Sequence, residues 1–128
     1  RVFAPGNDSE VYRVLNESGI FINITPGEQH LIEIKKVLYD EIKPYGIPEL
    51  PKGFVEANLK NDSQRVVGGE GIKNVKYKID LNDNASVKQL LSMTPFLWRG
   101  KREAREDLKE KKSLSVTIDM DIHCYRKI

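Results

Sequence analysis

Residues 19–43 decide the fold, and they read GIFINITPGEQHLIEIKKVLYDEIK. Their first part, Ile20 to Ile24, is a short β-rich apolar run between a glycine and a Pro-Gly pair, which is typical of a buried strand. The second part repeats apolar residues at helical spacing and offers one apolar face to a core: Leu31, Ile34, Val37, Leu38 and Ile42. The stretch therefore predicts a strand, a tight turn and a long helix.

Between the two elements stands Thr25-Pro26-Gly27-Glu28, which has the form of a capping box. The Thr25 hydroxyl can accept from the backbone N–H three residues on, Glu28 can reach back, and Pro26 suits the first helical position, where no N–H is needed. In open α/β sheets, ligands bind beyond the carboxyl ends of strands, beside helix N-termini with unpaired N–H groups. Residues 25–30 are therefore the first candidate site.

The rest of the chain is interpreted from local patterns. Residues 1–6 resemble the end of a strand followed by a loop, so strand, helix, strand and helix alternate as in a parallel α/β sheet with right-handed crossovers. Residues 113–125 alternate apolar and polar side chains and predict an antiparallel closing strand. The other expected elements are helices at 9–16, 85–92 (capped by Asn84) and 99–112, a strand at 75–81, and either a short strand or a turn of helix at 54–59.

Two further patterns are interpreted as structural. The glycine-rich stretch Gly68 to Gly71 lacks GxGxxG spacing, so it is expected to be a hairpin or loop rather than a phosphate cradle. In the closing strand, Asp119 and Asp121 fall on the polar face, where nothing else in the sequence supports a catalytic pair. His123 is expected to be a structural histidine of the same strand.

The composition fits one globular domain, residues 1–128, with 39% hydrophobic and 31% charged residues. No apolar run approaches the roughly 20 residues of a membrane span, and no signal peptide is visible, so a cytoplasmic protein without a membrane partner is expected. Cys124 is the one cysteine in the sequence, so neither an internal disulfide nor a cysteine-based zinc site is expected.

Charge is distributed unevenly along the chain. Residues 1–64 carry 7 basic and 10 acidic groups, whereas residues 65–128 carry 14 basic and 9 acidic groups. Such asymmetry can mark a side that faces phosphate, and the alternative is a solvated surface of mixed sign.

A second dense stretch, MTPFLWR, occupies residues 93–99. Phe96 and Trp98 stand beside Arg99, so the aromatic rings could stack on a nucleotide while the guanidinium binds phosphate. The alternative is that Trp98, which comes shortly after a helix-breaking proline, is buried in the hydrophobic core. The charged helix expected at 99–112 could touch an RNA backbone or could form a solvated face.

Four stretches can be compared with known families by their order and spacing: RVFAP at 1–5, NITPGEQHLIEIKKVLYDEI at 23–42, MTPFLWR at 93–99 and DMDIH at 119–123. In order and approximate spacing, they together resemble the carboxyl-terminal half of bacterial 23S rRNA (guanine-N1)-methyltransferases. The resemblance covers nearly the whole chain.

This resemblance implies a class I S-adenosylmethionine-dependent methyltransferase, which has a seven-stranded Rossmann-like sheet and an N-terminal zinc ribbon. The chain would supply the fourth to seventh strands, a partial α/β fold of mixed parallel and antiparallel strands with flanking helices. Neither the zinc ribbon nor the glycine-rich cofactor loop has a counterpart in this sequence. S-adenosylmethionine and zinc are therefore expected in the complete protein and not in this chain, and the fragment alone is expected to be inactive.

The resemblance also implies which residues line the site. Phe3, Ala4 and Pro5 match the motif that closes the fourth strand between cofactor and target base, and Phe3 and Ala4 could touch the cofactor. His30, Phe96, Trp98 and Arg99 would line the substrate side. N1 of guanine is a poor nucleophile while it is protonated, so such an enzyme must hold the flipped base in line with the methyl group and favour proton loss. The alternatives are a packed strand end for residues 3–5 and, for His30, a helix-surface histidine or a satisfied packing contact.

The implied partner is a hairpin of large-subunit rRNA. A half-sheet would expose an edge, so a homodimer through that edge or through swapped elements is also expected. Two other functions stay open: a methyltransferase of the same fold that acts on a small molecule, and a non-catalytic RNA-binding or assembly module. Neither the modified nucleotide nor the catalytic base can be assigned from the sequence.

Overall fold

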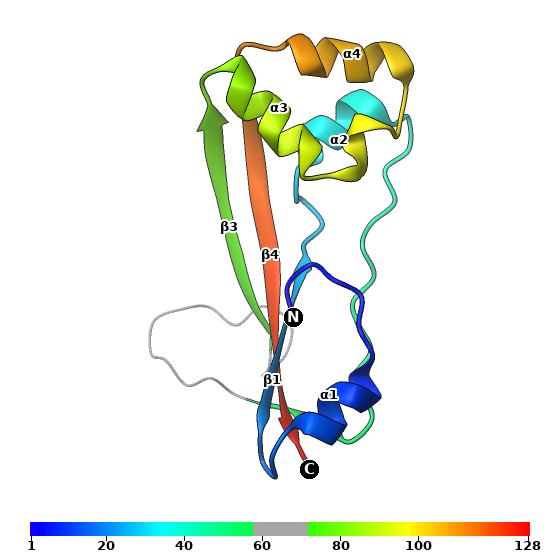
Figure 1. Ribbon diagram of the computed structural model, residues 1–128, viewed down its shortest axis with the longest axis vertical. Helices are drawn as coiled ribbons and strands as arrows, with labels where there is room; N and C mark the ends of the chain where they lie inside the picture. The colour runs from blue at the N-terminus through cyan, green and yellow to red at the C-terminus, as the bar shows by residue number, and fades with distance from the viewer. Residues whose placement is uncertain (58–71) are drawn as a thin grey trace. The chain divides into compact units, whose positions relative to one another are not determined.

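A computed structural model describes residues 1–57 and 72–128 of the chain (Figure 1). The described residues form two compact units. Unit 1 comprises residues 1–27, 45–75 and 119–128, and unit 2 comprises residues 28–44 and 76–118. The expected single domain stays a prediction, and the glycine-rich stretch Gly68 to Gly71 lies outside the described residues.

The longest strand is β4 (Leu114–Lys127), which comes last in the sequence and pairs with every other strand of a four-stranded sheet (Figure 1). The other strands are β1 (Ile20–Pro26), β2 (Phe54–Glu56) and β3 (Ile72–Leu81). Both β1 and β2 pair with β4 in antiparallel register, from Ile20 opposite Arg126 in one case and from Phe54 opposite Lys127 in the other. Figure 1 shows β3 running opposite to β4 as well.

The predicted parallel sheet is wrong, whereas the antiparallel closing strand is confirmed. Alternation of strands and helices along the sequence indicates that successive strands run in the same direction. It does not indicate which strands are adjacent in the sheet. Here β4 lies between β1 and β2 and also pairs with β3. Within the described residues, each of the three earlier strands therefore has β4 as its neighbour. Parallel pairing is limited to an isolated bridge between Val2 and Ile24 among the described residues.

Unit 1 has an aromatic core at one end of its sheet. Phe21, Phe54 and Tyr125 are buried together, with ring centroids 5.8 to 6.4 Å apart. The helix α1 (Asp8–Val14), predicted at 9–16, packs its Tyr12 ring edge-on against Phe54. The α1 helix therefore covers one face of the sheet at this end.

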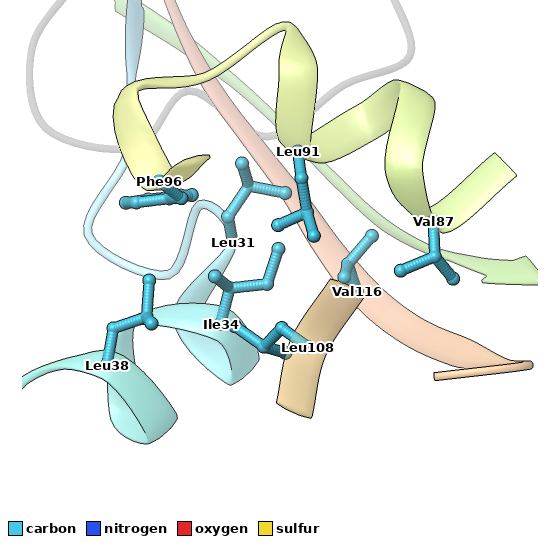
Figure 2. Close-up of a cluster of buried hydrophobic side chains, with 8 residues drawn as sticks. All are labelled: Leu31, Ile34, Leu38, Val87, Leu91, Phe96, Leu108 and Val116. Atoms are coloured by element: carbon cyan, nitrogen blue, oxygen red, sulfur yellow. The ribbon is translucent and has the colours of Figure 1, made fainter. Parts of the chain in front are cut away.

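Unit 2 has a mainly aliphatic core built by four helical segments and the first part of β4 (Figure 2). The helices are α2 (Ile32–Leu38), α3 (Asn84–Ser92) and α4 (Arg102–Glu110), and a short 3-10 helix, η1 (Pro95–Leu97), lies between α3 and α4 in the sequence. Their buried side chains point toward one another: Leu31, Ile34, Leu38, Val87, Leu91, Phe96, Leu108 and Val116. None of the helices in residues 1–57 and 72–128 is long and apolar enough to cross a membrane.

The predicted capping box at residues 25–28 is wrong. Thr25 and Pro26 belong to β1, and α2 begins only at Ile32, after Leu31 in a left-handed conformation that makes no side-chain cap. The cause is competition from β4. The Gly27 N–H donates to Asp119 O at 2.8 Å and the Leu31 N–H donates to Thr117 O at 2.8 Å, so this stretch stays bonded along β4 and cannot start a helix.

Smaller corrections concern burial and element ends. The run Ile20 to Ile24 is buried on one face only, because Phe21 and Asn23 point inward while Ile20 and Ile22 are exposed. The N-cap of α3 is Asp83 instead of Asn84, and its side chain accepts from Ser86 N at 2.7 Å.

Candidate functional site

The residues predicted for the site are divided between the two units. Unit 1 contains Phe3, Ala4, Pro5, Thr25, Pro26 and Gly27, and unit 2 contains Glu28, His30, Phe96, Trp98 and Arg99. Each group is described within its own unit.

In unit 1, strand pairing gathers polar side chains on one face of the sheet. Asn23 stands opposite His123 and Thr25 stands opposite Asp121. Directly opposite residues of an antiparallel pair share a face, so these four side chains lie on the same side. The Thr25 hydroxyl oxygen lies 2.9 Å from His123 Nε2. Thr25 therefore holds the imidazole in place instead of capping a helix.

Asp119 extends this face, because residues two apart along a strand point to the same side. Its side chain is only 3% exposed. The carboxylate fills the space beside Gly27, where an added Cβ would lie 2.4 Å from Asp119 Cγ. Gly27 is therefore required by close approach of the Asp119 side chain.

Asn74 of β3 joins the two acidic residues. Its side-chain amide donates to Asp119 Oδ1 at 2.7 Å and to Asp121 Oδ1 at 2.8 Å. We call Thr25, Asn74, Asp119, Asp121 and His123 the β4 polar cluster. Because Asn74 has no charge, the cluster keeps two carboxylates close together, with Asp121 partly exposed and Asp119 buried.

The His123 ring is buried at 2% exposure and lies parallel to the Tyr125 ring, with centroids 6.2 Å apart. Burial lowers the pKa of His123 below its ordinary value, although the negative charges of Asp121 and Glu56 oppose the shift. The imidazole is therefore neutral at pH 7. A neutral ring can either accept from or donate to the Thr25 hydroxyl.

The N-terminal segment lies beside the end of β1. Phe3 N donates to Ile24 O at 3.0 Å, and Phe3 takes a left-handed conformation with φ of 47°. Positive φ is uncommon for a residue with a side chain. Phe3 is 45% exposed, and Ala4 and Pro5 are exposed as well. The N-terminal segment therefore pairs with β1 through one isolated parallel bridge, between Val2 and Ile24, and leaves β1 close to Thr25.

In unit 2, the predicted aromatic pair is split between core and surface. Phe96 is buried and faces the edge of the Tyr39 ring at 6.4 Å between centroids, so it contributes to packing. Trp98 is 65% exposed and Arg99 is exposed, so the alternative that Trp98 belongs to the core is wrong. Glu28 is exposed and His30 is partly buried, and both precede the first turn of α2.

Neither strand-to-helix turn of the described chain fits the carboxylate end of S-adenosylmethionine. After β1, the space beside Gly27 already holds the Asp119 carboxylate, and the Gly27 N–H is bonded to Asp119 O. After β3, the turn Asn82-Asp83 contains no glycine, and the Asp83 carboxylate itself caps α3. A cofactor carboxylate would bind at such N–H donors, and in both turns a carboxylate of the chain itself already lies at that place. Residues 1–57 and 72–128 also contain no group of three or more His, Cys, Asp or Glu that could hold a metal ion.

Comparison with known proteins finds one informative similarity. The protein of Bacillus subtilis (strain 168) named "Putative 23S rRNA (guanine-N(1)-)-methyltransferase YxjB" is 30% identical to this chain over 123 residues. The resemblance inferred from the four stretches is confirmed. The match takes in 94% of this chain but 40% of the relative, so the chain spans well under half of that protein's length. No protein-family model matches the chain.

Sequence reasoning missed the β4 polar cluster as a unit. A signal was present, because Asp119, Asp121 and His123 alternate along one strand and so must share a face. Asn23 was a second signal, since it interrupts an apolar run at a buried position. The contribution of Asn74 could not be found, because it depends on how β3 pairs with β4.

Proposed function

We propose that this chain is part of an S-adenosylmethionine-dependent methyltransferase that methylates N1 of a guanine in 23S rRNA. The observation that carries the proposal is the 30% identity over 94% of the chain to a protein whose name states rRNA methylation at guanine N1. In this proposal, the cofactor and any zinc bind parts of the complete protein other than the turns described above. The hairpin of large-subunit rRNA is the proposed substrate and the cytoplasm the proposed location.

The β4 polar cluster supports guanine as the target base. The N1–H and the exocyclic amino group of guanine are neighbouring donors, and an ionised carboxylate is an acceptor with two oxygens. Asp121 is partly exposed, and one of its oxygens is already fixed by Asn74 at 2.8 Å. We assign Asp121 the role of accepting from the guanine edge, while the neutral His123 and Thr25 pair stabilises the strand beside it.

Methyl transfer to RNA tests the proposal directly. The complete gene product would be incubated with methyl-labelled S-adenosylmethionine and transcripts of 23S rRNA domains, and reverse transcription would locate the product. A methyl group on N1 blocks base pairing, so a transcription stop beside one guanine is expected. The stop should vanish when that guanine is changed to adenine or when Asp121→Asn is introduced.

Other outcomes separate the alternatives. Label in a small-molecule fraction without label in RNA would indicate a small-molecule methyltransferase. Salt-sensitive RNA binding without cofactor binding or transfer would indicate an assembly module. Calorimetric titration of S-adenosylmethionine into the complete product and into the 128-residue chain should show binding by the complete product alone. Tight binding by the chain itself would contradict the assignment of the cofactor site to other parts.

A further inference from the structure

Trp98 in unit 2 is exposed to an unusual degree for its size. Its side chain is 65% exposed, although tryptophan is highly buried on average. Met93, five residues earlier, is 82% exposed. Leaving a large indole ring in water forgoes the stabilisation that its burial would give, so an exposed ring of this kind often marks a binding surface.

The turn that carries Trp98 is fixed on both sides. Before it, Phe96 is buried in the core of unit 2. After it, Gly100 adopts a φ of 82° and packs so closely on Leu38 that an added Cβ would lie 2.8 Å from Leu38 Cβ. The Lys101 N–H then donates to Leu38 O at 3.2 Å. The backbone that carries Trp98 is therefore held in place before any ligand arrives, which lowers the entropy cost of binding.

Further bonds stabilise the same turn. Thr94 caps η1 by accepting from Phe96 N at 3.3 Å, and Arg105 donates from Nη1 to Leu97 O at 3.4 Å. Lys101 forms an ion pair with Asp40. These contacts all lie within unit 2, so the exposed ring stands on a braced part of that unit.

The charge around Trp98 is positive. Residues 84–102 contain four basic residues and no Asp or Glu. Arg99 and Arg102 are exposed, and no hydrogen bond or ion pair within residues 1–57 and 72–128 engages either guanidinium. The nearest acidic residues along the chain are Glu103, in the first turn of α4, and Asp83, whose carboxylate caps α3. Asp40, elsewhere in the sequence of unit 2, is paired with Lys101.

We infer that Trp98, Arg99 and Arg102 form a contact surface for single-stranded RNA, on which one base stacks on the indole ring and the two guanidinium groups bind adjacent phosphates. An aromatic platform beside cationic side chains is how proteins bind single strands without reading their sequence. Guanidinium groups suit phosphate because they donate two parallel hydrogen bonds. The inference rests on the proposed function in so far as RNA is the substrate, and it names the residues that would hold the strand.

The sequence provides a direct probe, because Trp98 is its one tryptophan. Titration of the 128-residue chain with a single-stranded oligoribonucleotide should quench the indole fluorescence as a base stacks on the ring. Variants without Trp98 give no indole signal, so their affinity for RNA is measured by the fluorescence anisotropy of an end-labelled oligoribonucleotide. Trp98→Ala should weaken binding roughly five- to 150-fold, whereas Trp98→Phe, which keeps an aromatic face, should lose much less.

The arginines are tested by the salt dependence of binding. Arg99→Gln with Arg102→Gln should reduce the slope of log affinity against log salt by about 1.4, which corresponds to two phosphate contacts on a single strand. Lys36→Gln with Lys76→Gln is the matched control, since it removes two exposed charges elsewhere in unit 2. The control should leave both the slope and the quenching close to those of the original chain.

Three results would overturn the inference: no quenching at RNA concentrations that saturate anisotropy, equal affinity of the Trp98→Ala variant, or equal slopes in the two double variants. Circular dichroism of each variant shows whether it is folded, and Trp98→Phe provides a second readout if Trp98→Ala is not. Failure of the proposed function gives a different pattern. RNA binding through Trp98 without methyl transfer by the complete product would contradict the function alone, and transfer that is unchanged in Trp98→Ala would contradict the inference alone.

Discussion

At the scale of one residue, Gly27 shows that a side chain from a distant part of the sequence, here Asp119, can require glycine at a turn. The Asp119 carboxylate occupies the place of its missing Cβ. We expect Gly27→Ala to lower the free energy of unfolding by about 1–3 kcal/mol, because a buried carboxylate has to move away from Gly27 and Asn74. Urea denaturation followed by circular dichroism measures the change.

Gly46→Ala is the control, since no heavy atom lies within 4 Å of an added Cβ at that position. Its effect should stay within about 0.5 kcal/mol of zero. Equal losses in the two variants would mean that backbone freedom, rather than the Asp119 contact, decides the cost.

His123 predicts a pH dependence at the same scale. Burial lowers its pKa in the folded state, so the unfolded chain binds a proton more readily than the folded chain does. Stability should therefore be complete above the unfolded pKa of about 6.5 and fall as the pH drops through that value toward the folded pKa. Urea midpoints between pH 5 and pH 8 measure this fall.

The variant His123→Gln should flatten that part of the curve, whereas His30→Gln, at the other histidine of the chain, should keep it. If the stability of both variants still falls between pH 7 and pH 5, groups other than His123 cause that fall. NMR titration of the His123 ring protons would give the direction of its shift independently.

At the scale of elements, the predicted capping box shows where local patterns stop deciding structure. Thr25 to Glu28 fit the motif, but β4 offers carbonyl acceptors to Gly27 and Leu31, and these bonds keep the chain extended. The strands at 75–81 and 113–125 were predictable because alternation of apolar side chains depends only on their own sequence. The start of α2 was not, since it depends on a strand more than eighty residues away.

Glu33, rather than Glu28, joins α2 to the sheet. Burial raises the pKa of Glu33, but hydrogen bonds from the Thr117 hydroxyl and backbone N–H, the latter at 2.8 Å, outweigh it and the pKa is lowered overall. Glu33→Ala should cost about 1.5–3 kcal/mol of unfolding free energy at pH 7. Because the lowered pKa favours the carboxylate, this cost should shrink as the pH falls below about 4.5.

Glu28→Ala tests the competing interpretation, since a capping box would make Glu28 the important carboxylate. We expect its effect to lie within about 0.5 kcal/mol of zero. A larger loss for Glu28→Ala than for Glu33→Ala in urea denaturation would restore the capping box and contradict the observed start of α2.

At the scale of the whole molecule, the candidate site could be predicted only in part. The resemblance to rRNA methyltransferases was readable from four short stretches, because such motifs are local. The β4 polar cluster joins β1, β3 and β4, so its composition follows from strand registers that no local pattern specifies. The exposure of Trp98 beside a buried Phe96 likewise depends on how η1 packs in unit 2.

The final prediction concerns association of the chain with itself. Ile20 and Ile22 of β1 share a sheet face with Val55 of β2, because Ile20 and Val55 both stand opposite Arg126. These three side chains are 37%, 41% and 39% exposed, and exposed apolar sheet surface favours association. We therefore expect a homodimer through this face.

Light scattering coupled to size exclusion should give twice the mass of 14.7 kDa at high concentration. Ile20→Thr with Ile22→Thr should shift the chain toward monomer, because threonine keeps β propensity while it removes apolar surface. Val37→Thr, at a residue that is also exposed but lies on α2, should leave the dimer intact. A monomer at every concentration, with one cooperative unfolding transition, would contradict the predicted dimer. The sheet would then be stable with this apolar face exposed to water.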